Sequence, residues 1–191
     1  MRRLSTLAVV VLAAVAPAGC GRDKVDPSDL EFKAGPRLVP ASYPEVGMRF
    51  RHPIGVGLVD KPAPGVFRGA AGEAFIAGFA YRRAEQIPRD SRELALARRR
   101  LIAATRKRGR DYKLTSARTL RVDGGRALEL LGDQDLSNTR LRTRSLHVFK
   151  GRAEYVIELT AAPADFPYLD RAVYRPIRRT LRLTGKIRKR R

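Results

Sequence analysis

The stretch RLRTRSLHVFKGRAEYVIELTA, residues 140–161, decides the fold of this chain. It contains two strand-like runs that meet at Lys150-Gly151. In the second run, Tyr155, Ile157 and Leu159 occupy alternate positions, which is the period-two pattern of a strand with one buried face. We therefore expect this run at the centre of a sheet. The first run should carry a wet, basic face, because every second residue at its start is basic: Arg140, Arg142 and Arg144.

Length and composition point to one domain with one core. The chain has 191 residues and is 43% hydrophobic. Lysine and arginine number 40 against 19 acidic residues, which gives a formal net charge of +21. This excess favours anionic partners, and the open alternative is that a GC-rich genome enriched arginine without selection for anion binding. The single cysteine, Cys20, excludes an intramolecular disulfide framework and a multi-cysteine metal site.

Residues 1–20 are expected to be a lipoprotein signal peptide. Arg2 and Arg3 precede an apolar run over residues 7–16, which is shorter than the roughly 20 residues needed to span a bilayer. Pro17-Ala18-Gly19 then leads directly to Cys20, and this ending resembles the lipobox of bacterial lipoproteins. We predict that Cys20 is lipidated and holds the protein at the extracytoplasmic face of the cell membrane. The alternative is an ordinary cleaved signal peptide with an incidental cysteine.

The rest of the chain divides into three parts. Residues 21–43 are polar, contain Pro27, Pro36 and Pro40, and are expected to form a flexible tether. Residues 44–184 are the predicted domain. Residues 185–191 are expected to be a disordered basic tail, because from Arg175 to the end the chain has nine basic residues and no acidic one.

Within the domain, alternating patterns and turn signals indicate several strands. We expect them at residues 46–52, 56–59, 74–81, 112–122 and 126–131, with a brief edge strand at 66–68 and a short closing strand at 181–183. The run 74–81 is nearly continuous apolar, so it should be covered on both faces. Asp123-Gly124-Gly125 is a hairpin turn signal. Residues 132–138 are interpreted as a polar loop.

Two helices are predicted. Asp90 and Glu93 have the spacing of a capping box and should begin the first helix. Its apolar stripe is Leu94, Ala97, Leu101 and Ala104, and its opposite face carries Arg92, Arg99 and Arg106. The second helix has an apolar stripe formed by Phe166, Leu169, Val173 and Ile177. Pro176 should kink or shorten it, because proline lacks an amide donor.

The sequence predicts no catalytic residue, no cofactor site and no metal site. Both histidines, His52 and His147, occupy inward positions of predicted strands, where a hydrogen-bonded structural histidine is expected. The serines lack nucleophile motifs. Asp133-x-Asp135 opens like a calcium loop, but Asn138 stands where glycine is required and Arg144 where glutamate is required. We therefore interpret the protein as a non-enzyme.

Three basic groups are candidates for anion binding. They are the helix face (Arg92, Arg99 and Arg106), the strand row (Arg140, Arg142 and Arg144) and the tail (Arg188, Lys189 and Arg190). The alternative for each group is a solvated face. Nucleic acid is not an expected partner, because aromatic residues for base stacking are missing beside the charges of the helix face and the tail. Anionic lipid, an anionic wall polymer or an acidic protein fits better.

The order of elements resembles PsbP-like domains, which include bacterial lipoproteins of the LpqN/LpqT type. The resemblance covers about residues 43–184. It rests on Phe50-x-x-Pro53, on the run from Phe79-x-Tyr81 to Pro88, on Gly151-x-x-x-Tyr155-Val156, on Phe166 and on the closing Arg179-Thr180-Leu181-Arg182-Leu183. It implies an α+β fold, an α/β/α sandwich in which an antiparallel sheet is flanked by two main helices. It also implies a binding or accessory role without a shared active site.

Together these observations predict an exported, lipid-anchored envelope protein. Its domain is expected to be a non-catalytic binding module for anionic envelope components or an acidic protein partner. The alternative is an accessory subunit of a membrane complex that holds a protein or small ligand in a groove near residues 61–72.

Overall fold

A computed structural model gives the fold of the chain and describes residues 35, 37–108, 112–136 and 139–188. All of these residues belong to one unit, Phe32–Arg191. The predicted signal peptide of residues 1–20, with Cys20, lies outside the described residues, as do most of the predicted tether and the two tail residues Lys189 and Arg190.

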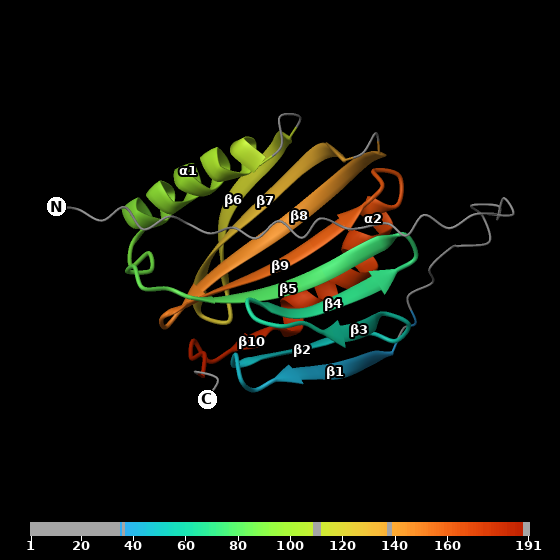
Figure 1. Cartoon of the computed structure of the whole chain (residues 1–191), viewed down its shortest axis with the longest axis horizontal. Coiled ribbons are helices and arrows are strands. Elements are labelled where there is room, and N and C mark those ends of the chain that lie inside the picture. Colours follow the sequence, from blue (N-terminus) through green and yellow to red (C-terminus); the bar gives the residue numbers. More distant parts are fainter. Residues whose placement is uncertain (1–34, 36, 109–111, 137–138, 189–191) are drawn as a thin grey trace, which may run out of the picture. The chain divides into compact units, whose positions relative to one another are not determined.

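The strands are β1 (Leu38–Tyr43), β2 (Met48–Pro53), β3 (Gly57–Asp60), β4 (Gly65–Ala71), β5 (Ala74–Arg82), β6 (Lys113–Val122), β7 (Gly125–Leu136), β8 (Thr139–Lys150), β9 (Ala153–Ala161) and β10 (Arg182–Leu183). The helical segments are α1 (Ser91–Arg108), α2 (Phe166–Leu169), the π-helical turn η2 (Asp170–Tyr174) and α3 (Arg175–Thr180). Along the chain, strands β1–β5 precede helix α1, strands β6–β9 follow it, and the second helical segment and strand β10 come last (Figure 1).

The strands form two antiparallel sheets. The large sheet has the order β3-β4-β5-β9-β8-β7-β6, and the small sheet has the order β1-β2-β10. Strand β9 is therefore the middle strand of the large sheet, as predicted. Both of its faces are buried, because Glu154 and Val156 are covered as completely as Tyr155 and Ile157. The prediction of a single buried face was wrong, since different segments cover the two sides of the sheet.

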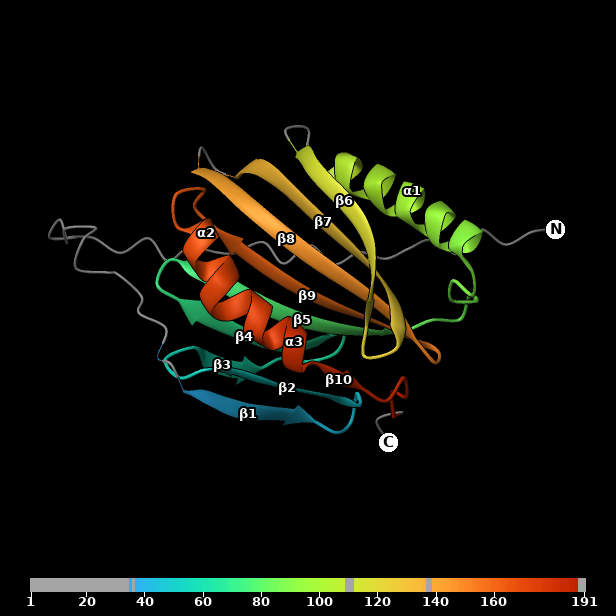
Figure 2. The ribbon, with the colours of Figure 1, turned by 180° about the vertical axis from the view of Figure 1, so that it is seen from behind.

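Helices pack on opposite faces of the large sheet. Helix α1 lies on one face, and α2, η2 and α3 follow one another across the other, as the view from behind shows (Figure 2). Leu94 of α1 is buried against Leu128 and Phe149, with Ala97 and Leu101 beside them. The main core lies on the other face and includes Ile157, Phe166, Val173 and Ile177. The predicted α/β/α sandwich with an antiparallel sheet and two flanking helices is confirmed.

The start of α1 follows from its capping residues. The Glu93 amide donates to Asp90 Oδ1 at 2.8 Å, and the Arg89 amide donates to Glu93 Oε2 at 2.7 Å. These two bonds satisfy amides that have no partner inside the helix. Asp90 and Glu93 therefore cap the helix as predicted, except that Glu93 accepts from the Arg89 amide, one residue before Asp90, and the helix begins at Ser91.

The second helical segment runs without a break over residues 166–180. The sequence predicted a kink or an early end at Pro176. The turn before this proline instead widens into the π-helical turn η2, in which the Arg175 amide reaches back to the Asp170 carbonyl. Proline has no amide hydrogen, so the wider turn accommodates the missing donor without ending the helix. The four predicted stripe residues, Phe166, Leu169, Val173 and Ile177, are all buried.

Two turns join the long hairpins. Asp123 and Gly124 have positive φ values of 48° and 76°, the backbone that a two-residue hairpin turn of type I′ requires. At the second turn, Gly151 lies so close to Gly185 that a methyl group on either residue would collide with the other segment. The Arg152 amide donates to the Gly185 carbonyl at 3.3 Å. The segment that follows β10 is thus fixed against the β8–β9 turn.

Several sequence predictions are corrected at the ends of elements. Residues 38–43, taken as tether, form strand β1, which pairs with β2. Residues 132–136, taken as loop, continue β7. The brief edge strand at 66–68 is part of β4, which lies between β3 and β5. Strand β10 closes the small sheet, not the large one. Residues 185–188, predicted to be disordered, make defined contacts: Gly185 is buried, and the Arg188 amide donates to the Glu45 carbonyl at 2.8 Å.

Candidate functional site

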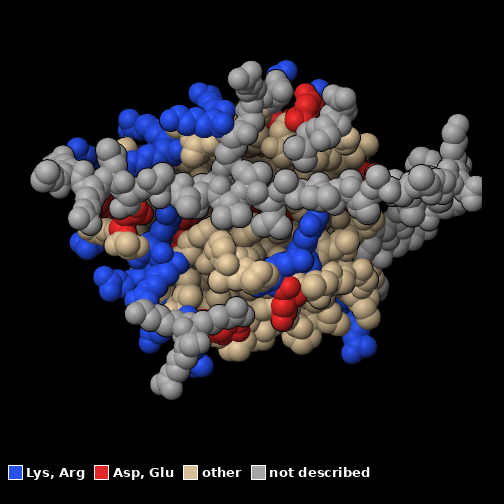
Figure 3. Space-filling model, viewed as in Figure 1, with Lys and Arg blue, Asp and Glu red and all other residues tan. Residues whose placement is uncertain are grey.

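The predicted basic face of α1 is exposed. Arg92, Arg99 and Arg106 point to solvent, and none of them makes an ion pair with another described residue. Further basic side chains of the same helix are also exposed, and we call the whole set the α1 basic face: Arg92, Arg98, Arg99, Arg100, Arg106 and Lys107. In Figure 3 basic side chains gather over the part of the molecule where α1 lies in Figure 1.

The strand row is wet only at its start: the side chain of Arg140 is 62% exposed, whereas those of Arg142 and Arg144 are 30% and 14% exposed. Arg142 binds Asp133 through two bonds, from Nε to Oδ1 at 2.6 Å and from Nη2 to Oδ2 at 3.0 Å, and Arg140 Nη2 reaches Oδ2 at 3.2 Å. The hydrogen bond from Arg142 is the main reason that the pKa of Asp133 lies below its usual value. The charges of Arg140 and Arg142 are therefore directed to a carboxylate of the neighbouring strand.

Arg144, the third member of the strand row, lies between the large sheet and the second helical segment. Its side chain is only 14% exposed. Its Nη1 donates to Glu129 Oε1 at 2.9 Å, and its Nε lies 2.8 Å from Asp170 Oδ1. The guanidinium also lies over the rings of Phe166 and Tyr174, at 5.7 and 5.6 Å from their centroids. Arg144 thus connects β8 to the helical segment.

Glu129 is the centre of this polar network. The residue is 1% exposed, yet it has four partners: Arg118, Arg144, Tyr174 and Arg178. The Tyr174 hydroxyl donates to Oε2 at 2.6 Å. Burial opposes ionisation, but the hydrogen bonds from Tyr174 and Arg118 and the neighbouring positive charges outweigh it and lower the pKa of Glu129. Burial and the charge of Glu129 raise the pKa of Tyr174, so its hydroxyl stays a donor.

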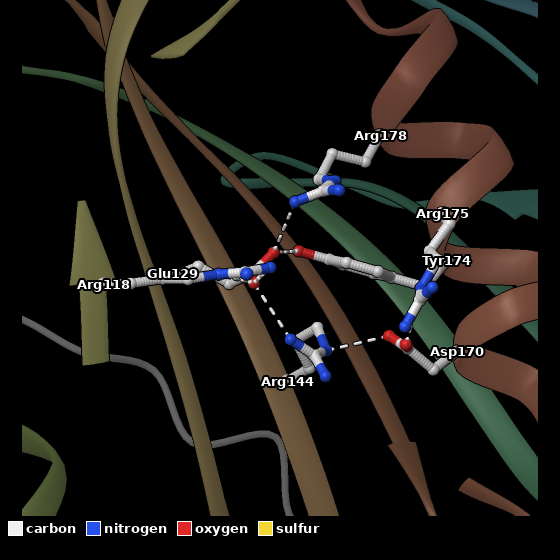
Figure 4. A network of polar contacts seen from close by, with 7 residues as sticks. All are labelled: Arg118, Glu129, Arg144, Asp170, Tyr174, Arg175 and Arg178. Carbon is white, nitrogen blue, oxygen red and sulfur yellow. Dashed lines mark hydrogen bonds and ion pairs between the residues drawn. The ribbon is translucent and has the colours of Figure 1, made fainter. Parts of the chain in front are cut away.

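A cavity of about 240 Å³ opens beside this network. We call it the arginine cleft, and Figure 4 shows its side chains converging from the sheet and from the helical segment. On the side formed by the helical segment, Arg175 Nε donates to Asp170 Oδ2 at 2.9 Å. The residues that line the cleft are Arg118, Arg144, Asp170, Tyr174, Arg175 and Arg178. The arrangement offers fixed guanidinium groups to a small polar ligand.

Sequence reasoning found only Arg144 among these residues. One signal could have found two more: Arg118 and Glu129 stand at equal distances from the Asp123-Gly124 turn, so the hairpin register places them opposite each other. A cross-strand pair of opposite charges follows from that register alone. Asp170, Tyr174, Arg175 and Arg178 give no such signal, because their position depends on how the helical segment crosses the sheet.

The two histidines have the structural role expected from the sequence. His147 is buried, and its Nδ1 lies 2.7 Å from Glu154 Oε1. Burial opposes the ionisation of Glu154, but His147 and the adjacent Arg83 outweigh it and lower the pKa of that carboxyl. His52 is buried, and its Nδ1 lies 3.1 Å from the Pro53 carbonyl. Among the described residues, no group of three histidine, aspartate or glutamate side chains is placed to hold a metal ion.

Two further predictions concern other parts of the surface. A second cavity, of about 310 Å³, is lined by residues 84–87, Arg89, Gly151 and Arg152. Neither this cavity nor the arginine cleft includes a residue of the predicted groove at 61–72. Of the tail candidates, Arg188 is exposed. In the part of the chain that the structure describes, no helix has the length and apolar character needed to cross a membrane.

Comparisons with known proteins find similarity in structure only. No protein-family model matches the sequence, and no curated protein sequence matches it. Among solved structures, the cyanobacterial PsbP protein CyanoP from Synechocystis sp. PCC 6803 aligns with a TM-score of 0.58 and 12% identity over 76% of this chain and 92% of that one. LpqN from Mycobacterium tuberculosis, described as involved in cell envelope biogenesis, aligns with a TM-score of 0.57 and 14% identity over 78% of this chain and 91% of that one.

Both alignments cover almost the whole of the other protein and most of the described unit here. At these identities they establish the fold and leave the activity open. They agree with the resemblance inferred from the pattern of strands and helices in the sequence. The described unit of this chain therefore has a PsbP-like fold.

Proposed function

We propose that this chain is an exported, lipid-anchored envelope protein whose PsbP-like domain works without catalysis, by binding an anionic partner. The α1 basic face carries this proposal. Its guanidinium and ammonium groups are exposed and make no ion pairs with other described residues, whereas the strand arginines are held by their own carboxylates. The α1 basic face therefore presents its full charge to an external anion.

The chemistry of the face favours an extended anion over a single small ligand. Arg92, Arg99 and Arg106 follow one another at intervals of seven residues, or about two helical turns, so they form a line of roughly 20 Å. Exposed guanidinium groups in such a line attract a charged surface or polymer through long-range forces that salt screens. An anionic lipid surface is the partner we propose first, because the predicted lipid at Cys20 would keep the domain close to one.

The similarity to LpqN supports the cellular setting. That protein is described as involved in cell envelope biogenesis, and it shares the fold of this chain. The sequence adds the apolar run at residues 7–16 and the small residues before Cys20, which favour export and lipidation. Replacing Cys20 by alanine and testing incorporation of labelled lipid precursor would check the anchor separately from the binding.

Vesicle binding tests the α1 basic face. The chain from Gly21 is suitable, because the main core draws all of its buried residues from 43–183. We compare it with a variant carrying Arg92→Gln, Arg99→Gln and Arg106→Gln, using phosphatidylglycerol-containing and neutral vesicles. At about 1 kcal/mol per basic residue near the surface, the three changes should weaken binding to anionic vesicles about 100-fold at low salt.

A matched variant separates this face from net charge. Arg49→Gln, Arg171→Gln and Arg179→Gln also remove three exposed arginines, but from β2 and from the helical segment on the other side of the large sheet. This variant should bind anionic vesicles nearly as well as the unchanged protein. Equal losses in the two variants, or binding to neutral vesicles at the same strength, would contradict the proposal.

A further inference from the structure

We propose that the arginine cleft binds a phosphoryl group that carries two negative charges, as in inorganic phosphate or a phosphomonoester. The cleft is separate from the α1 basic face, because it lies where the helical segment of residues 166–180 meets the opposite side of the large sheet (Figure 4). The inference therefore does not depend on the proposed surface binding.

The first argument is charge. The guanidinium groups of Arg118, Arg144, Arg175 and Arg178 surround the cleft, and Glu129 and Asp170 are the carboxylates that pair with them among the described residues. Glu129 is ionised at neutral pH because its pKa is lowered. Counted formally, four guanidinium groups and two carboxylates leave an excess of two positive charges. A dianion matches this excess, whereas a neutral ligand would leave it uncompensated.

The second argument is the supply of donors. A guanidinium group has five N–H donors in a planar fork. Arg175 uses Nε toward Asp170, and Arg178 reaches Glu129 only through Nη1 at 3.4 Å. Neither side chain makes another polar contact with a described residue, so most of their donors remain available beside the cavity. Arginine forks bind phosphoryl oxygens in pairs, which favours phosphate over a single halide ion.

The third argument is positional rigidity. Arg144 is held by two carboxylates and two aromatic rings, and the Tyr174 hydroxyl fixes Glu129 from the other side. The charged wall of the cleft is thus in place before a ligand arrives, which reduces the entropy lost on binding.

Size and polarity define the class of ligand. A volume of about 240 Å³ holds about eight water molecules at roughly 30 Å³ each, enough for a tetrahedral oxyanion with part of its hydration shell. The cleft is lined by arginine, aspartate and tyrosine, with no aliphatic side chain. It therefore recognises the phosphoryl group itself and offers little to an attached apolar group.

The test measures binding of inorganic phosphate to the chain from Gly21 by calorimetric titration at constant ionic strength, with chloride as the reference anion. Phosphate should bind saturably and raise the melting temperature more than chloride does. Arg175→Gln and Arg178→Gln, made separately, should each weaken phosphate binding about tenfold, because each removes charge-assisted hydrogen bonds. Arg175 contacts Asp170 and not Glu129, so its variant keeps all four contacts of Glu129 even if Arg178→Gln is less stable.

Matched variants make the outcome specific to the cleft. Arg171→Gln and Arg179→Gln lie in the same helical segment outside the cleft and should leave phosphate binding unchanged. Two further probes separate the sources of the phosphoryl group: glycerol phosphate represents a soluble phosphomonoester, and vesicles containing phosphatidic acid represent a lipid headgroup. The inference is supported if the protein binds either probe and Arg175→Gln weakens that binding. Phosphate binding no stronger than chloride binding, or binding unaffected by Arg175→Gln and Arg178→Gln, overturns it. Loss of vesicle binding only in the α1 variant would leave the cleft result unchanged.

Discussion

At the scale of single residues, Glu129 is a buried carboxylate that links the large sheet to the helical segment through four partners. Replacing it by glutamine keeps the volume but removes the negative charge that compensates Arg144, Arg118 and Arg178. Breaking a buried ion pair from one side leaves the other charge uncompensated. We expect Glu129→Gln to reduce the free energy of unfolding at pH 7 by about 3 kcal/mol, measured by urea denaturation.

The same substitution should change the pH dependence of stability. The pKa of Glu129 in the folded state is lowered from an ordinary value of 4.5, so its charge stabilises the folded protein above that pH. This contribution is lost as the pH falls through the lowered folded value. The difference in unfolding free energy between the two proteins should therefore shrink below about pH 4.5. Glu73→Gln, at an exposed position, is the control, and a difference that stays constant from pH 7 to pH 3 would contradict the assigned role of Glu129.

The sequence predicted where individual charged residues lie better than it predicted which residues they contact. The row Arg140, Arg142 and Arg144 was correctly placed on one strand face. The same alternation continues to Leu146 and Val148, which are buried, and this local sign that the face is covered was missed. Whether a charged strand face is wet depends on the segment that packs on it. That segment lies more than 20 residues further along the chain, and its crossing angle is not encoded in a short pattern.

At the scale of secondary-structure elements, β9 supports the fold because both of its faces are buried. Ile157→Ala removes a side chain with no exposed surface from the main core and leaves a cavity between close-packed neighbours. We expect a loss of about 2–5 kcal/mol in unfolding free energy. Val59→Ala in edge strand β3 is the control. Its side chain is 61% exposed, so the loss should be within about 0.5 kcal/mol. Similar losses in both variants would show that β9 is not the central strand in solution.

Elements with a strong internal pattern were predicted well, and their ends were not. The capping box of α1 and the turn at Asp123-Gly124 carry their signals in adjacent residues, so their positions were correct. Strand β1 contains Pro40 and lies at the edge of the small sheet, where a proline is tolerated and a period-two pattern is weak. Residues 132–136 look like a polar loop in the sequence. They extend β7 to Leu136 because they pair with β8.

At the scale of the whole molecule, the contact between Gly151 and Gly185 joins the C-terminal segment to the central hairpin. Gly185→Ala should destabilise the fold for two reasons: the backbone there has φ of 74°, and a methyl group would lie 2.9 Å from the Lys150 carbonyl oxygen. Gly124→Ala is a matched control, with φ of 76° but open space around it. We expect Gly124→Ala to cost about 1 kcal/mol and Gly185→Ala distinctly more, as measured by urea denaturation. Equal costs would mean that the close approach is relieved at little expense.

The architecture as a whole was accessible from sequence because order and type of elements restrict an antiparallel sandwich to few arrangements. The division into two sheets was not accessible. The sequence around Leu183 predicts a closing strand but does not indicate which strand it pairs with. The helical segment of residues 166–180 crosses the large sheet and brings Leu183 to β2.

The small sheet pairs β2, near the start of the domain, with β10, near its end. One edge of β2 therefore stays unpaired until residues 182–183 have been synthesised. A chain that is synthesised N-terminus first can form the hairpins of the large sheet in turn, because each hairpin joins neighbouring strands. The β2–β10 pairing joins the most distant ones and carries the highest cost of loop closure. Completion of this fold thus requires residues 182–183 in addition to the hairpins of the large sheet.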